Sequence, residues 1–111
     1  MDKTIQKFKA MGDKNRFRIL MMLLIRPLCV CELLAVLNIK GGTLSAHLKI
    51  LKNAELISQE KDGRWIVYSL STEDTKIFLI NIRKELFDIS KITGDEKIIT
   101  NISRDICSNF S

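Results

Sequence analysis

The chain has 111 residues, of which 46% are apolar and one is proline, which favours one domain with a modest core over two. We therefore expect residues 1–111 to form a single DNA-binding and dimerisation domain. The formal charge of +5 favours a polyanionic partner. The longest apolar run, Ile19 to Ile25, is far shorter than the ~20 residues of a membrane-spanning helix. Because Met1-Asp2-Lys3 begins no signal peptide, we expect a cytoplasmic protein without a membrane partner.

The sequence contains three cysteines, Cys29, Cys31 and Cys107. In a reducing cytoplasm, an odd number of cysteines is better explained by ligands, redox groups or small core residues than by a disulfide framework. The sequence has one histidine, no glycine-rich phosphate loop and no serine in a recognised catalytic motif. We therefore expect neither an enzyme nor an organic cofactor.

Two helices are predicted at the start of the chain. The first spans roughly Lys3 to Met11, where apolar residues recur at helical spacing, and it ends at Gly12. Asp13 is a good N-cap for a second helix that runs to about Ile25. Arg26-Pro27 ends this helix, because the residue before a proline is pushed out of the helical region.

A helix-turn-helix is predicted next. Cys29-Val30-Cys31 leads into a short helix through Leu37, and the segment from Asn38 to Gly42 is predicted to be a turn. A further helix spans Thr43 to Asn53, with its apolar residues at helical spacing: Leu44, Leu48 and Leu51. Two short helices joined by a tight turn that contains glycine are typical of DNA-binding proteins of this kind.

A hairpin and two more helices are predicted in the second half. The β-rich runs 56–60 and 65–70 flank an Asp-Gly turn, which predicts a hairpin that serves as a wing. Ser71-Thr72-Glu73 caps a long helix to about Ile92, and a last amphipathic helix follows Thr93-Gly94-Asp95. The expected fold is α+β and mostly α, a winged helix-turn-helix with a two-stranded hairpin wing.

Three motifs carry a resemblance to a known family. They are Leu28-Cys29-Val30-Cys31-Glu32-Leu33, the run from Leu44-Ser45-Ala46-His47-Leu48 to Ile57, and the run from Asp62-Gly63-Arg64-Trp65 to Leu70. Over roughly residues 13 to 70, in this order, the chain resembles the arsenic-repressor (ArsR/SmtB) winged-helix regulators. Members of the family are homodimeric repressors that leave their operator when a metal or metalloid binds. The resemblance implies a homodimer, double-stranded operator DNA and the same response here.

The cysteines are the candidate metal site. Thiolates are soft ligands that select soft ions. Residues two apart on a regular helix do not face each other, so Cys29 and Cys31 converge on one ion only if Cys29 lies in an extended or capping segment. The family's arsenic-sensing pattern often has a third cysteine where this chain has Leu34, and Cys107 is the candidate replacement. We expect As(III) or Sb(III) as the inducer, with Cd or Pb as alternatives.

Other interpretations of the cysteines stay open. The same pair is consistent with a redox or sulfide switch on a DNA-binding repressor. It is also consistent with a thiol-redox protein or metal carrier that lacks specific DNA binding, or with small buried core residues. Cys107 borders the apolar stripe of the last helix and is equally consistent with packing in a dimer interface. Glu32 is expected to be a solvated charge or a helix-end residue.

Candidate DNA contacts lie on or beside the helix from Thr43 to Asn53 and at the hairpin tip. Thr43 and Ser45 are expected to read base edges, and basic residues are expected to neutralise phosphates. The basic residues are Lys40, Lys49, Lys52, Lys61 and Arg64. His47 is a further candidate, with a hydrogen bond inside the helix-turn-helix as the alternative. The terminal apolar helices need a partner surface, so we expect a twofold dimer with recognition helices ~34 Å apart on an inverted repeat.

Overall fold

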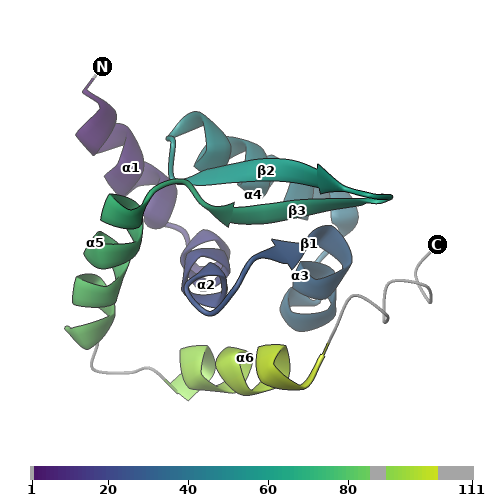
Figure 1. Cartoon of the computed structure of the whole chain (residues 1–111). Helices are drawn as coiled ribbons and strands as arrows, with labels where there is room; N and C mark the ends of the chain where they lie inside the picture. The colour runs from purple at the N-terminus through teal and green to yellow at the C-terminus, as the bar shows by residue number, and fades with distance from the viewer. Residues whose placement is uncertain (1, 86–89, 103–111) are drawn as a thin grey trace.

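The computed structural model describes residues 2–85 and 90–102, without the side chains of residues 90–93. Within these residues, helices and strands follow one another as α1 (Lys3–Met11), α2 (Lys14–Leu23), β1 (Leu28–Cys29), α3 (Val30–Leu37), α4 (Gly41–Asn53), β2 (Ile57–Asp62), β3 (Trp65–Leu70), α5 (Glu73–Lys84) and α6 (Ser90–Asn101). Figure 1 shows α3 and α4 as a helix-turn-helix, with the β2–β3 hairpin extending beside it. The expected winged helix-turn-helix is confirmed.

The core forms where α2, α3 and α4 meet the sheet. Every residue of α2 from Arg18 to Leu23 is buried, and α4 buries one leucine face, made of Leu44, Leu48 and Leu51. The N-cap of α2 is Asp13, as predicted, and its Oδ1 accepts the backbone N–H groups of Asn15 at 2.8 Å and Arg16 at 3.0 Å. Apolar side chains gather in this core, and no helix in the described ranges is long and apolar enough to cross a membrane.

The turn between α3 and α4 differs from the prediction. Asn38 makes the turn in the left-handed region, with φ 55° and ψ 48°, and ends α3. Gly41 and Gly42 belong to α4, whose N-cap is Lys40. Asparagine enters the left-handed region more readily than most residues, so the turn needs no glycine. The helix α4 therefore begins two residues before the predicted Thr43.

The sheet has three strands where two were expected. β1 pairs antiparallel with β3 through Leu28–Tyr68 and Cys29–Val67, which gives the order β1-β3-β2. A strand of two residues has no periodicity that sequence inspection can detect. The hairpin forms as predicted, but β2 continues two residues beyond the predicted run, to Asp62, and the turn consists of Gly63, with a positive φ of 62°, and Arg64.

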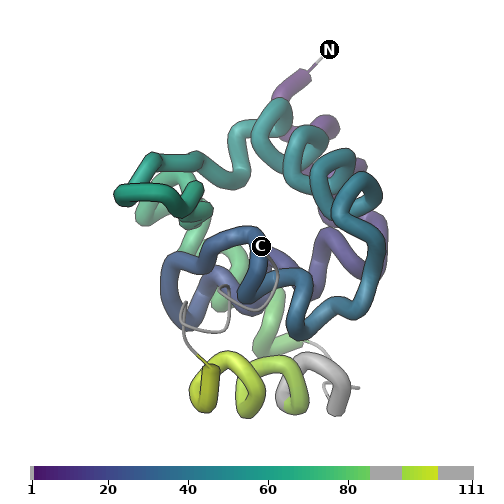
Figure 2. Tube along the Cα trace, turned by 90° about the vertical axis from the view of Figure 1, so that its right-hand side faces the viewer, coloured from purple at the N-terminus to yellow at the C-terminus, as the bar shows by residue number. Residues whose placement is uncertain are grey.

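The last two helices have other bounds than predicted. α5 ends at Lys84 and not near Ile92, while α6 begins at Ser90 and runs through the expected break at Thr93-Gly94-Asp95. Asp95 forms a buried ion pair with Arg18 of α2, and this tertiary contact outweighs the low helix propensity of Gly94. In Figures 1 and 2, α6 lies across the lower edge of the molecule, where it packs against α2 and α3.

Candidate thiol site and nucleic-acid interface

Two sulfurs meet at the start of the helix-turn-helix. Cys29 Sγ and Cys31 Sγ are 3.2 Å apart. Cys29 is the N-cap of α3 in an extended conformation, with φ −90° and ψ 167°, and Cys31 lies in the first helical turn. The capping conformation that convergence of the two sulfurs requires is therefore present. Cys31 is disulfide-bonded in this structure, so the two sulfurs are within reach of a single soft ion once that disulfide is reduced.

Burial controls the protonation of Cys29. Its side chain is 1% exposed. Burial raises the pKa of the Cys29 thiol, and the nearby Glu32 carboxylate raises it further, against the opposing effect of backbone N–H groups at residues 31 and 32. Because a metal ligand must be deprotonated, binding of an ion at this sulfur releases a proton.

Glu32 lies next to the cysteine pair. It is buried, whereas a solvated charge or a helix-end residue was expected. Its side chain is 1% exposed, and Oε1 accepts the backbone N–H of Cys29 at 3.0 Å. Its Oε2 lies 2.9 Å from Nη2 of Arg26. Burial acts to raise the pKa of Glu32, but the Cys29 N–H and Arg26 outweigh burial and leave the pKa below its ordinary value. Glu32 is thus a charged residue at a helix end, in a capping box with Cys29.

The rest of the predicted metal site is not described. Within residues 2–85 and 94–102, whose side chains the structure gives, no three histidine, cysteine or acidic side chains come together in a way that could hold a metal ion. Cys107, the candidate third ligand, lies outside the described residues.

The predicted DNA contacts, His47 excepted, are exposed on or beside α4 and on the wing. α4 and the wing are on the side away from α6 (Figures 1 and 2). Seven of the eight candidates are exposed: Lys40, Thr43, Ser45, Lys49, Lys52, Lys61 and Arg64. Thr43 and Ser45 lie near the N-terminus of α4, the part of a recognition helix that reaches base edges. The guanidinium of Arg64 stacks over Trp65 at 4.7 Å from the ring centroid, which holds a cation at the wing tip.

His47 points into the protein. Its side chain is 13% exposed. Its Nδ1 lies 3.2 Å from Nη1 of Arg16, whose Nε donates to the carbonyl of Ala10 at 2.7 Å. His47 thus has an internal hydrogen bond, but to Arg16 of α2 and not within the helix-turn-helix as the alternative to DNA contact had it, and this bond ties α4 to the junction of α1 and α2.

Three buried or bridging charges escaped the sequence analysis. Arg18 and Asp95 form a two-point ion pair at 2.8 and 2.9 Å across 77 positions of sequence, and no local pattern marks such a pair. The sequence marks Arg26 as the residue before Pro27 and as a charge near the cysteines, but not its contacts with Glu32 and α6. Its neighbour Glu32 had a detectable signal, because a capping box places Glu three positions after the N-cap. Because cysteine is an unusual N-cap, the sequence analysis did not identify Cys29 and Glu32 as a capping box.

The sequence of this chain is similar to those of known regulatory proteins. Residues 13–59 match the family described as "Bacterial regulatory protein, arsR family". The chain is 37% identical to the arsenical resistance operon repressor of Escherichia coli (strain K12) over 111 residues, which covers 96% of this chain and 91% of that protein. The chain belongs to the arsR family. Another arsR-type relative, the arsenical resistance operon repressor of Bacillus subtilis (strain 168), is 43% identical over 70 residues, covering 62% of this chain and 67% of that one.

A solved structure extends the comparison to three dimensions. Reduced HlyU from Vibrio cholerae N16961 superimposes with a TM-score of 0.70 at 30% identity, over 78% of this chain and 90% of that one. The arsR-family match spans α2 to the start of β2, and it includes both the cysteine pair and α4. The two features described above therefore lie within the part of the chain that identifies the family.

Proposed function

We propose that this arsR-family protein is a homodimeric transcriptional repressor that binds an inverted-repeat operator and is released by As(III) or Sb(III). The observation that carries the proposal is the pair of sulfurs, 3.2 Å apart, at the N-cap of the first helix of the helix-turn-helix. Cd or Pb are the alternative inducers. Two of its relatives are arsenical resistance operon repressors, which supports a metalloid as the inducer.

The donor atoms favour a thiophilic inducer. Cys29 and Cys31 offer sulfur, which suits soft ions, whereas zinc sensors of the family use histidine and carboxylate. The one histidine of the sequence, His47, is hydrogen-bonded to Arg16. The inducer would supply a soft centre that holds the two thiolates together once Cys31 is reduced, and binding at Cys29 would release the proton of that thiol.

Cys107 is proposed as the third thiolate. Arg26 donates from Nη2 to the carbonyl of Ile102 at 3.0 Å, so the carboxyl end of α6 lies close to the segment that carries Cys29. Cys107 follows Ile102 by five positions in the sequence, and five residues span up to ~17 Å when extended. A third sulfur from the same chain is therefore within reach of the pair.

The cysteine pair and the recognition helix α4 belong to one structural unit, the helix-turn-helix. The pair caps α3, and α3 is joined to α4 through the turn at Asn38. An ion that draws the sulfurs together alters the start of α3, which supports the recognition helix. Release from DNA requires that the ion prefer the DNA-free conformation, and a typical coupling of about 1–3 kcal/mol is sufficient.

The DNA surface is proposed from exposure and charge. Thr43 and Ser45 read bases, while Lys40 and the exposed basic residues of α4 and the wing contact phosphates. His47 is left out of this surface, because it is turned towards Arg16.

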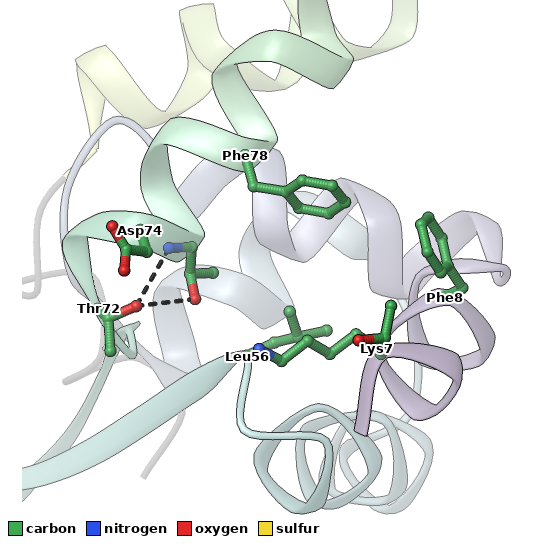
Figure 3. Close-up of a pocket in the computed structure, with 8 residues that line it drawn as sticks. Lys7, Phe8, Leu56, Thr72, Asp74 and Phe78 are labelled. Carbon is green, nitrogen blue, oxygen red and sulfur yellow. Dashed lines mark hydrogen bonds between the residues drawn. The ribbon is translucent and has the colours of Figure 1, made fainter. Parts of the chain in front are cut away.

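A surface formed by α1 and α5 is proposed to hold the second copy. Its exposed apolar residues are Ile5, Phe8, Ile77, Phe78 and Ile80. The rings of Phe8 and Phe78 meet edge to face at 6.0 Å beside a hollow of about 330 Å³ (Figure 3). Such a concentration of exposed apolar side chains on two neighbouring helices is typical of a protein–protein interface.

A titration of operator-bound protein tests the inducer. We expect arsenite and antimonite to release the wild-type protein, and the variants Cys29→Ser and Cys31→Ser to stay bound. Cys107→Ser tests the third ligand, and full response of this variant would remove Cys107 from the site. Zinc is the control ion.

The redox alternative is decided by the same assay. Release by peroxide or persulfide, but by none of As(III), Sb(III), Cd or Pb, would replace the metalloid proposal with a thiol switch at the same cysteines.

A further inference from the structure

An ion pair with one buried partner, Glu32, lies next to the thiol pair. Glu32 is 1% exposed, and its two oxygens divide between the Cys29 backbone N–H and the guanidinium of Arg26. A charged carboxylate is costly to bury, and a hydrophobic side chain of similar volume often serves stability equally well. The further contacts of Arg26 show which parts of the structure the Glu32–Arg26 ion pair links.

Arg26 also holds the carboxyl end of α6. Its Nη2 donates to the carbonyls of Ile102 at 3.0 Å and Ile99 at 3.3 Å. The last carbonyls of a helix have no partner within the helix, and a cation there is favoured by the helix dipole. One guanidinium thus contacts both the carboxylate under Cys29 and the end of α6.

The contacts form an unbroken chain from the site to the helix. It runs from the Cys29 backbone to Glu32, from Glu32 to Arg26 and from Arg26 to α6, and each link is 2.9–3.3 Å long. The sulfur of Cys29 shares a capping box with Glu32, so an ion on that sulfur competes with the capping interaction. α6 in turn packs against α3, the helix that the cysteines begin.

We propose that Glu32 and Arg26 are positioning residues that couple occupation of the Cys29–Cys31 site to the seating of α6. This inference rests on the proposed function, because it concerns how the inducer acts. Neither residue binds the inducer. Their loss weakens the response to the ion while the thiols still bind it.

Two variants break the link in different places. Glu32→Gln keeps a carbonyl oxygen for the Cys29 N–H but loses the charge that pairs with Arg26. Arg26→Lys keeps a cation but replaces the guanidinium, whose Nη2 makes all three contacts, with an ammonium on a shorter side chain. The side chain of Arg26 is 35% exposed, so Arg26→Lys is expected to fold even where a buried glutamine is not tolerated. The matched control is Arg83→Gln, which removes a different ion pair to α6, the one with Glu96.

The experiment measures the operator Kd with and without saturating arsenite, and the ultraviolet absorbance of arsenic–thiolate bonds. We expect the ratio of the two Kd values to fall about 2- to 30-fold in Glu32→Gln and in Arg26→Lys, with the absorbance unchanged. Arg83→Gln is expected to respond like the wild type. Full response of both link variants, or an equal loss in Arg83→Gln, would overturn the inference alone. A wild-type protein that arsenite does not release would overturn the proposed function and this inference with it.

Discussion

At the scale of single residues, Asp13 shows how one carboxylate organises the start of α2. Its oxygen accepts two backbone N–H groups of the first turn, and His47 lies 4.0 Å away. The hydrogen bond from the Arg16 backbone is the largest cause that lowers the pKa of Asp13 below its ordinary 3.8. A lowered folded-state pKa means that Asp13 stabilises the fold above pH 3.8, and that this contribution is lost as the pH falls through the folded-state pKa.

Asp13→Ala is expected to lower the free energy of unfolding by about 1 kcal/mol at neutral pH, because α2 loses its N-cap. Asp13→Asn keeps an acceptor but loses the charge, so its stability is expected to lie between those of the wild type and Asp13→Ala. Urea unfolding across a pH series measures both. The difference between the wild type and Asp13→Ala should shrink below pH 3.8, and a difference that stays constant into acid would contradict the role assigned to the charge.

Cys29 and Glu32 mark the limit of residue-level prediction. That Cys29 must lie in a cap for the sulfurs to meet follows from helical geometry alone, and the structure has it there. The burial of Glu32 does not follow from the local sequence, since its partner Arg26 lies on the other side of Pro27 and is itself bound to the end of α6.

At the scale of elements, α4 separates two tasks on two faces. Its leucines are buried, and the positions between them expose residues suited to DNA, among them Thr43, Ser45 and Lys49. Such a division allows substitutions on the outer face to change DNA binding without altering the fold.

Lys49→Ala is expected to weaken binding to operator and random DNA by similar factors and to reduce the slope of log affinity against log salt by about one unit. Ser45→Ala is expected to lose about 1–3 kcal/mol on the operator alone, if its hydroxyl makes a good base contact. Fluorescence anisotropy over a salt series measures both, with Lys76→Ala on α5 as the charge-matched control. Equal losses on both DNAs for Ser45→Ala would show that Ser45 does not read bases.

The elements that sequence predicted correctly are those with local signals. α1, α2 and the hairpin are bounded by Gly12, Asp13 and the Asp62-Gly63 turn, and each signal acts within a few residues. The ends of α5 and α6 depend on the contact of Asp95 with Arg18, from the other end of the chain. Gly94 therefore led to the prediction of a helix boundary at residues 93–95, but the contact of Asp95 with Arg18 keeps this segment within α6.

At the scale of the whole molecule, the Arg18–Asp95 pair fixes α6 to the core. The side chains are 11% and 7% exposed, so neither charge is well solvated. The bond to Asp95 raises the pKa of Arg18, which stays charged.

Asp95→Ala is expected to lower the free energy of unfolding by about 3–5 kcal/mol, because it leaves a buried charge without its partner. Replacing both residues, by Arg18→Met and Asp95→Leu, is expected to cost much less or to stabilise the fold. Denaturant unfolding of the single and double variants compares the two cases. A double variant as unstable as Asp95→Ala would indicate that α6 needs the ion pair itself.

The exposed apolar residues of α1 and α5 set the expected assembly. Ile5, Phe8 and Ile77 are 49%, 55% and 51% exposed, although they lie at helical spacing that would suit a core. Apolar side chains gathered in this way lose their contact with water when a second copy covers them. We expect a dimer of about twice 12.7 kDa in sedimentation.

Phe8→Glu is expected to convert this dimer to a monomer, because the charge would be buried between the copies without a partner. Operator affinity should fall with it, since a monomer contacts one half-site of the inverted repeat. The matched control is Ile25→Glu, an exposed apolar residue beyond the end of α2 that is 41% exposed and not part of the α1–α5 surface. If Phe8→Glu sediments as a dimer with unchanged operator affinity, the two copies meet elsewhere. If Ile25→Glu alone becomes monomeric, the interface lies near the end of α2.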